Sequence, residues 1–231
     1  MTLPALRPAK SWPAILETIA RDAALTEDRQ RWALPPHSDA APPFAYRWEH
    51  VQAVVRLAGQ LVAAEGSDWD VVLAAAWLHD TQKRHTYHSG RGADYAREVL
   101  PRTDFPAAKI DAVAHAIAHH EGLWRPAPGW QEPHPFVAAP PLAPLETAIL
   151  WDADKLAKIG PTGLLHGFGF GLAQGEDLAS FAATAMWWRE HFSRTLASFN
   201  TPSARAWARE RYLVVLRFFD VLAVETASPQ A

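Results

Sequence analysis

Histidine and aspartate side chains interrupt apolar helical patterns at three separate places in this sequence. His79 and Asp80 close the apolar run 71–78. His50 lies on the apolar side of an earlier helical pattern, and Asp152 lies in the middle of a later one. Imidazole and carboxylate groups together suit divalent cations of intermediate hardness. The pattern therefore predicts a metal site that joins three helices, the alternative being core groups that only form hydrogen bonds.

The predicted helix end at His79 is what would let two neighbouring residues share one ion. Side chains of adjacent residues diverge by about 100° inside a helix. Where the helix unwinds, His79 and Asp80 can point to the same place. The apolar residues that precede His79 at helical spacing put its ring on the buried side of the helix.

The composition limits which groups could hold a metal. The chain has 231 residues, 49% of them hydrophobic, which is enough for a sizeable core. It has no cysteine, so a metal site must use the eleven histidines and the carboxylates. The net charge of −3 provides no overall positive field that would attract nucleic acid, so we do not expect a nucleic-acid partner.

No targeting or membrane segment is predicted. Residues Met1 to Lys10 lack the apolar core of a signal peptide. No apolar run approaches the roughly 20 residues that a membrane-spanning helix needs. We therefore expect a cytoplasmic protein without a membrane partner.

The apolar periodicity predicts an all-α fold, since strand patterns are nearly absent. We expect one domain, residues 1–231, with a helical core at about 46–175, additional helices before it and a C-terminal helical extension at about 176–225. The expected helices span residues 11–32, 46–65, 68–80, 93–100, 105–121, 145–159, 177–199 and 203–224.

Two segments lack a helical pattern. Residues 124–144 are rich in proline and aromatic residues, which predicts a long loop that could act as a lid. Residues 160–175 are rich in glycine but contain no Gly-Lys-Ser or Gly-Lys-Thr, so we expect a flexible turn region near the site rather than a phosphate loop. The aromatic residues of the last two helices favour core packing, with a homodimer interface as the alternative.

The sequence resembles the HD-domain metal-dependent phosphohydrolases over about Arg47 to Gly175. The resemblance rests on the order of His50, the pair His79-Asp80 and Asp152, within the segments WLHDTQKRH, IAHHEG and ILWDADKLAKIGPTG. The last segment looks like that of a bacterial subgroup that acts on nucleotides. The resemblance implies an HD-type helical bundle in which these four residues bind manganese, nickel, cobalt, magnesium or iron.

Some branches of that family hold a second metal ion with additional histidines. His88 and the pair His119-His120 occupy plausible positions for that role, or for contact with substrate. Helical spacing favours His120 as the inward residue, but His119 pairs with His115 along a neighbouring file, so the choice stays open. The resemblance thus implies one or two ions.

Basic residues close to these positions suit a phosphorylated substrate. Lys83 lies three residues after Asp80, as in the His-Asp-x-x-Lys variant of the family, and Lys155 lies three residues after Asp152. Arg84 is a weaker candidate. The resemblance implies that a metal ion activates water toward a phosphate group while such cations hold it.

The predicted function is hydrolysis of a phosphoester or phosphoanhydride bond in a small, nucleotide-like substrate. A nucleotidase, a nucleotide pyrophosphatase and a phosphodiesterase all fit that description. The family also contains di-iron oxygenases that use the same histidines and aspartates, and this is the main alternative. A non-catalytic nucleotide-sensing module and a nuclease are further alternatives.

Overall fold

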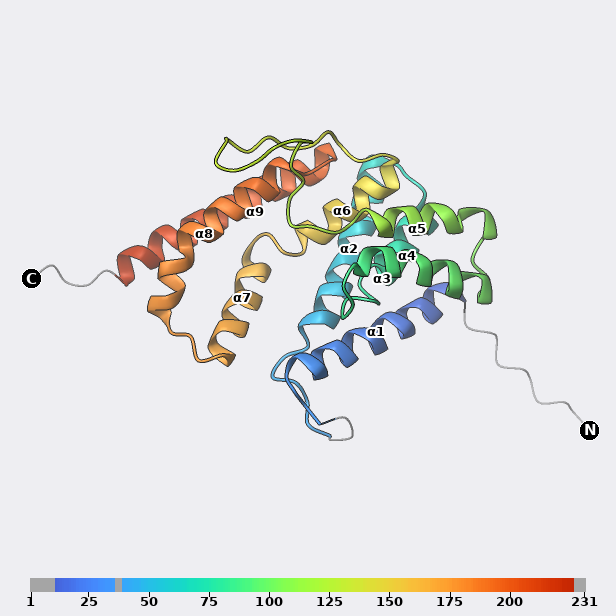
Figure 1. Ribbon diagram of the computed structural model, residues 1–231, viewed down its shortest axis with the longest axis horizontal. Coiled ribbons are helices and arrows are strands. Elements are labelled where there is room, and N and C mark those ends of the chain that lie inside the picture. The colour runs from blue at the N-terminus through green and yellow to red at the C-terminus, as the bar shows by residue number, and fades with distance from the viewer. Residues whose placement is uncertain (1–10, 36–38, 227–231) are drawn as a thin grey trace, which may run out of the picture.

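The protein is all-α, as the periodicity predicts (Figure 1). The computed structural model describes residues 11–35 and 39–226, so the residues searched for a signal peptide lie outside it. No strand occurs among the described residues, which form α1 (Trp12–Arg31), α2 (Tyr46–Glu65), α3 (Trp69–Leu78), α4 (His88–Val99), η1 (Leu100–Arg102), η2 (Ala107–Lys109), α5 (Ile110–Ala118), α6 (Leu145–Leu156), α7 (Pro161–Ala173), α8 (Leu178–Ala197) and α9 (Pro202–Glu225). No helix in these ranges is long and apolar enough to span a membrane.

Helix α6 lies at the centre of the molecule. Figure 1 shows it between α1 to α5 on one side and α7 to α9 on the other. It packs against α2, α3, α5 and α9, and every residue from Thr147 to Leu156 is buried. An interior helix of this kind has no solvent face, so polar residues on any of its sides need a partner inside the protein.

Helix α3 begins and ends at the residues that local chemistry favours. The Asp68 carboxylate accepts the backbone N–H groups of Asp70 and Val71, which caps the first turn. The helix ends at Leu78, and His79 is its C-cap. The predicted helix end is therefore confirmed, and Asp80 lies in the turn that follows.

The glycine-rich segment forms a helix, which corrects the expectation of a turn region. Glycine in a helix interior costs about 1 kcal/mol relative to alanine, and this cost favoured the turn prediction. Close packing accounts for glycine at two of these helical positions, because a Cβ on Gly169 would lie 3.0 Å from the Phe44 ring and one on Gly171 would lie 2.8 Å from the Phe181 ring. A second difference is that α4 begins at His88 rather than at residue 93.

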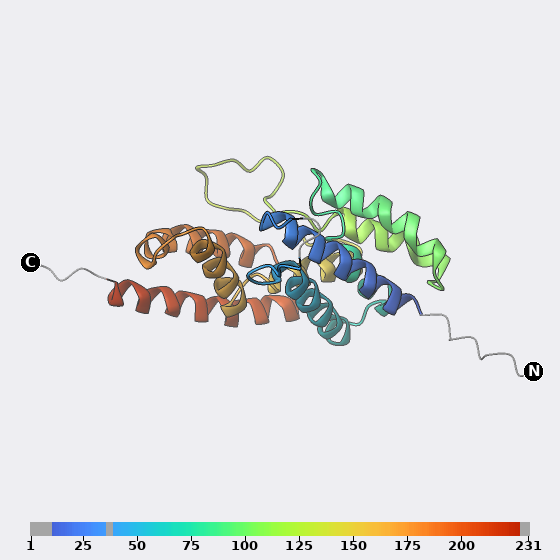
Figure 2. The same ribbon diagram turned by 90° about the horizontal axis from the view of Figure 1, so that it is seen from below.

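Residues 124–144 form the long loop that their composition predicts, but the loop is fastened to the C-terminal helices. The Arg125 guanidinium donates to Asn200 Oδ1 at 2.6 Å, and the Arg125 backbone N–H donates to Ser198 Oγ at 2.9 Å. Figure 2 shows the loop projecting beside α8. The cavity described below is lined by Leu123 but, among the described residues, by none from 124–144. The structure thus gives no support to a lid role.

Candidate metal centre

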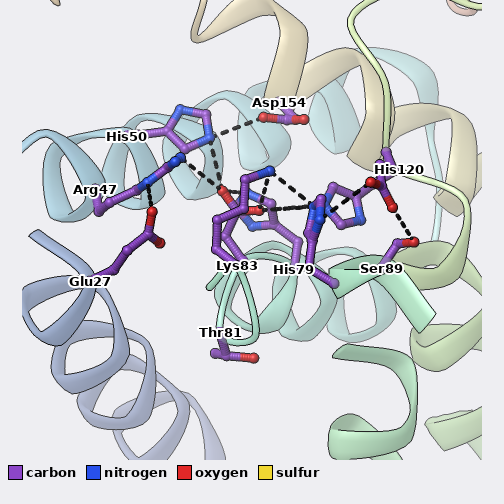
Figure 3. Close-up of polar contacts among 12 residues, drawn as sticks. Glu27, Arg47, His50, His79, Thr81, Lys83, Ser89, His120 and Asp154 are labelled. Carbon is purple, nitrogen blue, oxygen red and sulfur yellow. Dashed lines mark hydrogen bonds and ion pairs between the residues drawn. The ribbon is translucent and has the colours of Figure 1, made fainter. Parts of the chain in front are cut away.

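Three of the predicted ligands, His50, His79 and Asp80, meet at the junction of α2 and the end of α3; Figure 3 labels the two histidines. One donor atom from each of His50, His79 and Asp80 lies within 4.8 Å of the other two. Asp80 Oδ2 lies 3.7 Å from His50 Nε2 and 3.6 Å from His79 Nε2. All three residues are buried. The arrangement could hold a divalent metal ion.

The backbone sets which ring nitrogen faces this site. His79 Nδ1 lies 2.8 Å from the carbonyl oxygen of Ala76, and His120 Nδ1 lies 2.6 Å from that of Ile117. A carbonyl oxygen can only accept, so Nδ1 carries the proton in both rings. Each Nε2 therefore presents an unshared electron pair to the cluster, as a metal ligand requires.

Most of the potential ligand atoms in the cluster have no hydrogen-bond partner. The Nε2 atoms of His79 and His120 and both carboxylate oxygens of Asp80 are buried without one, and His50 Nε2 makes no well-aligned hydrogen bond although Asp154 Oδ1 lies 3.0 Å away. Leaving a buried polar group unsatisfied costs about 1–3 kcal/mol, and here four such atoms converge. A divalent cation fits this donor set, because it would satisfy nitrogen and carboxylate ligands at once.

A second group of potential ligands shares Asp80 with the first. It consists of Asp80, His88 and His120, all buried, with donor atoms again within 4.8 Å of one another. His88 is the first residue of α4, and its Nδ1 lies 3.4 Å from Glu121 Oε1. Asp80 thus belongs to both groups of residues that could hold a metal ion.

Asp154 lies next to His50 of the first group, a position that the sequence did not indicate. Its Oδ1 lies 3.0 Å from His50 Nε2, about the spacing of neighbouring ligand atoms around one ion. Lys158 Nζ lies 2.6 Å from the same oxygen, and the buried Lys155 ammonium contacts Oδ2. Burial would raise the pKa of Asp154, but Lys155 and Lys158 hold it well below its ordinary value. Asp154 is therefore a carboxylate ready to bind a cation.

Asp152 does not join the cluster, which corrects its assignment as a ligand. Its Oδ1 accepts the backbone and side-chain N–H groups of Asn200 at 2.9 and 2.8 Å. Its Oδ2 accepts the backbone N–H and the hydroxyl of Thr201, both at 2.8 Å. Residues two apart on a helix differ by about 200°, so Asp152 and Asp154 point in opposite directions. Asp152 instead holds the start of α9 against α6.

Burial also sets the protonation of the cluster. It lowers the pKa of His79 to about 3 and that of His88 to about 4, and it lowers the pKa of His50 as well. Burial would raise the pKa of Asp80, but nearby positive charge, including the Lys83 ammonium 3.4 Å away, holds it well below its ordinary value. Neutral imidazoles next to an ionised carboxylate are the forms that bind metal ions.

The structure separates the two histidines between which the sequence left a choice. Helix α5 ends at Ala118, so His119 is the C-cap and His120 lies one residue beyond. His119 is exposed, with its ring 4.3 Å from the His115 ring. His120 is 1% exposed and faces the cluster.

This difference gives a matched pair of variants. His120→Ala should lower the metal content or the affinity for a second ion, because it removes a buried Nε2 from the group with Asp80 and His88. His119→Ala should leave both unchanged, because that side chain lies outside the cluster. Elemental analysis and Mn²⁺ titration of the two variants would check this. Equal metal binding by both variants would contradict the assignment of His120.

The predicted cations lie in different surroundings. Lys83 Nζ lies 2.9 Å from His88 Nε2 and 3.4 Å from Asp80 Oδ1, so it is at the cluster. Lys155 is buried and donates to the His120 carbonyl oxygen at 2.9 Å, in addition to its contact with Asp154. Arg84 faces a different cavity, beside α1, and its Nε lies 3.3 Å from His85 Nε2.

Sequence reasoning missed two charged residues at the site besides Asp154. Arg47 Nη1 lies 3.6 Å from Asp80 Oδ2, although Arg47 stands only three residues before His50 in the sequence. Lys158 lies four residues after Asp154. Residues three or four apart are neighbours on a helix, so the spacing from a ligand candidate could have identified Arg47 and Lys158.

Comparison with known proteins agrees with this geometry. Residues 47–159 match the family model of the HD domain. A predicted HD superfamily hydrolase from an uncultured Thermotogales bacterium is 22% identical, with a TM-score of 0.60 over 98% of this chain and 100% of that one. Bacillus subtilis YpgQ in complex with ADP is 20% identical, with a TM-score of 0.60 over 92% and 98%. An HD-superfamily hydrolase from Bacillus thuringiensis is 18% identical, with a TM-score of 0.58 over 93% and 98%. No protein of curated function matches significantly.

Residues 47–159 of this chain form an HD domain, and the fold of the chain is similar to that of HD-superfamily hydrolases. HD domains bind divalent metal ions, and the histidine and aspartate groups described above could hold such an ion. The matched residues contain His50, the pair His79-Asp80 and Asp154. Helix α1 and helices α7 to α9 lie outside them.

Proposed function

We propose that this protein is a metal-dependent phosphohydrolase that cleaves a phosphoester or phosphoanhydride bond in a small, nucleotide-like substrate. The observation that carries the proposal is a cluster of unsatisfied metal-ligand atoms beside a cavity lined by cations. His50, His79, Asp80 and Asp154 would hold the principal ion, and His88 and His120 would complete a second position with Asp80.

The cavity next to the cluster has the charge that a phosphate group requires. Its volume is about 360 Å³, and its lining includes Arg47, Lys83, Lys155 and Lys158. A smaller cavity of about 240 Å³ shares the three lysines and reaches His88, His120 and Asp154. A phosphate group in this space would therefore contact cations and potential metal ligands together.

The opposite part of the cavity wall is aromatic, which supports a nucleotide as the substrate. Phe170 from α7 and Trp187, Trp188 and His191 from α8 line the same cavity. Trp187 and His191 stack with ring centroids 3.5 Å apart, and Trp187 is 49% exposed. Any nucleobase can stack on such aromatic side chains, because every base has a π-face. The ADP in the YpgQ structure supports the same substrate class.

The chain's own residues would prepare the reaction in three ways. A bound divalent ion supplies a Lewis acid that lowers the pKa of water and polarises a phosphoryl oxygen. Lys83 would hold a phosphate oxygen close to Asp80, since its ammonium already lies 3.4 Å from that carboxylate. Lys155 and Lys158 would keep Asp154 ionised and correctly oriented. Arg47 would add charge from the α2 side of the cavity.

Elemental analysis and product release would test the proposal together. The protein should be purified without chelator and supplied with Mn²⁺ and a panel of nucleoside mono-, di- and triphosphates. We expect one or two transition-metal ions per chain and release of phosphate or pyrophosphate from at least one nucleotide. Asp80→Ala should lose both the metal and the release, which excludes a contaminating phosphatase. Absence of metal and of release from the wild-type protein would contradict the proposal.

One observation favours a second candidate, a di-iron oxygenase. Asp80 belongs to both groups of potential ligands, so His50, His79 and Asp80 could hold one iron while His88 and His120 would help to hold a second. The same elemental analysis separates the two activities. Two irons per chain, together with oxygen consumption and no phosphate release, would favour the oxygenase.

A further inference from the structure

Helix α1 reaches the candidate site although it lies outside the residues that match the HD domain. Its last turns carry the neighbours Glu27 and Asp28, and both contact Arg47 at the start of α2 (Figure 3 shows the Glu27 contact). Glu27 Oε1 accepts Arg47 Nε at 2.6 Å. The two Asp28 carboxylate oxygens lie 3.2 and 3.1 Å from the Arg47 backbone nitrogen and accept its N–H.

These contacts fix Arg47 at both of its ends. Asp28 is fully buried and holds the backbone, where it also replaces a missing cap, because Ala45 at the N-cap of α2 offers no side-chain acceptor. Glu27 accepts a hydrogen bond from the Nε–H of the side chain. A guanidinium has five N–H donors in a rigid plane, so a partner at Nε determines where the two terminal nitrogens point.

The terminal nitrogens point to the candidate site. Arg47 Nη1 lies 3.6 Å from Asp80 Oδ2, and the side chain lines the cavity. The guanidinium also lies over the Tyr46 ring, with its central carbon 5.1 Å from the ring centroid. Its side chain is only 9% exposed, so it has little freedom to reach solvent. The 3.6 Å separation leaves Nη1 available to a ligand beside Asp80.

Glu27, rather than Asp80, makes the close hydrogen bond to the Arg47 side chain. The Glu27 contact is about 1 Å shorter than the Asp80 contact, 2.6 Å against 3.6 Å. Without Glu27, the strongest remaining carboxylate near the guanidinium would be Asp80 itself. Arg47 would then neutralise a potential metal ligand instead of facing the cavity.

We propose that Glu27 and Asp28 form a clamp that positions Arg47 for a phosphate group of the substrate. In this role both are positioning residues, and the HD-type site is incomplete without α1. The inference rests on the proposed phosphohydrolase function, because it assigns a phosphate to the cavity.

A double-mutant cycle would test the clamp without relying on turnover. Inorganic phosphate would be titrated calorimetrically into the full-length protein, as purified with its metal, and into Glu27→Ala, Arg47→Met and the double variant. Glu27→Ala should weaken phosphate binding about tenfold, the scale of one charge-assisted hydrogen bond. The double variant should bind as weakly as Arg47→Met alone, because Glu27 acts only through Arg47. Glu27→Gln, which keeps an acceptor oxygen, should lose less.

Controls separate this effect from a loss of folding. Glu17→Ala removes the same charge from an exposed position on α1 and should leave phosphate affinity unchanged. Each variant's thermal unfolding should be measured in parallel, since a merely structural role would change the melting temperature without producing non-additive affinities. Wild-type affinity in Glu27→Ala, or additive losses in the double variant, would overturn the clamp alone. No phosphate binding by the wild-type protein would overturn both the clamp and the proposed function.

Discussion

Asp154→Asn should remove most of the metal from the purified protein and abolish hydrolysis. The change is nearly isosteric, but it replaces an ionised carboxylate by a neutral amide beside His50 Nε2, Lys155 and Lys158. Loss of a group that only orients a metal ligand typically costs 10- to 100-fold in metal affinity. Loss of a ligand itself should therefore cost more than about 100-fold. Mn²⁺ titration and elemental analysis would measure it.

The control for this variant is a second substitution that removes a carboxylate charge far from the metal cluster. Asp111→Asn removes an exposed carboxylate on α5, where its partner is Arg97, and should retain metal and activity. Circular dichroism should show that Asp154→Asn stays helical. Full metal occupancy in Asp154→Asn would mean that the principal ion is held by the α2 and α3 residues without α6.

Asp152→Ala should have the opposite result, with a large loss of stability and retention of the metal. The substitution leaves four buried donors of Asn200 and Thr201 without their acceptor. At about 1–3 kcal/mol for each unsatisfied group, and with some relaxation, we expect the free energy of unfolding to fall by about 4 kcal/mol. For a protein of this size that corresponds to a melting temperature lower by about 10 °C.

The measurement is thermal unfolding combined with metal content. Asp152→Asn should fall between the wild type and Asp152→Ala, since one amide oxygen can still accept two of the four hydrogen bonds. Below its melting temperature, Asp152→Ala should bind Mn²⁺ with wild-type affinity. If Asp152→Ala instead lost its metal while unfolding at the wild-type temperature, Asp152 would be a metal ligand and would not be the residue that holds α9 against α6.

The sequence alone determined the features that depend on local periodicity. Apolar residues at helical spacing were enough to predict an all-α protein and the bounds of α2, which are Tyr46 and Glu65 as expected. The same periodicity placed His50 and His79 on buried faces. The end of the apolar run predicted the helix end that lets Asp80 meet them. These features need no information about distant parts of the chain.

Only the tertiary structure could decide between Asp152 and Asp154. The apolar stripe that pointed to Asp152 is real, but α6 is buried on every side, so a stripe cannot say which neighbour a carboxylate faces. Asp152 meets Asn200 and Thr201, which lie 48 and 49 residues later. Asp154 meets His50 from the opposite direction. If α6 had one side in solvent, its apolar pattern alone would have shown which of the two aspartates points into the protein.

Long-range packing also decided the remaining features. The glycine-rich segment forms α7, and aromatic rings pack closely on its Gly169 and Gly171, contacts that helix propensity cannot show. His120 rather than His119 faces the cluster because α5 ends at Ala118, two residues before it. Glu27 reaches Arg47 across 20 residues. Periodicity along the chain thus set what is buried, while the identity of each buried partner depended on contacts between helices that the sequence does not encode locally.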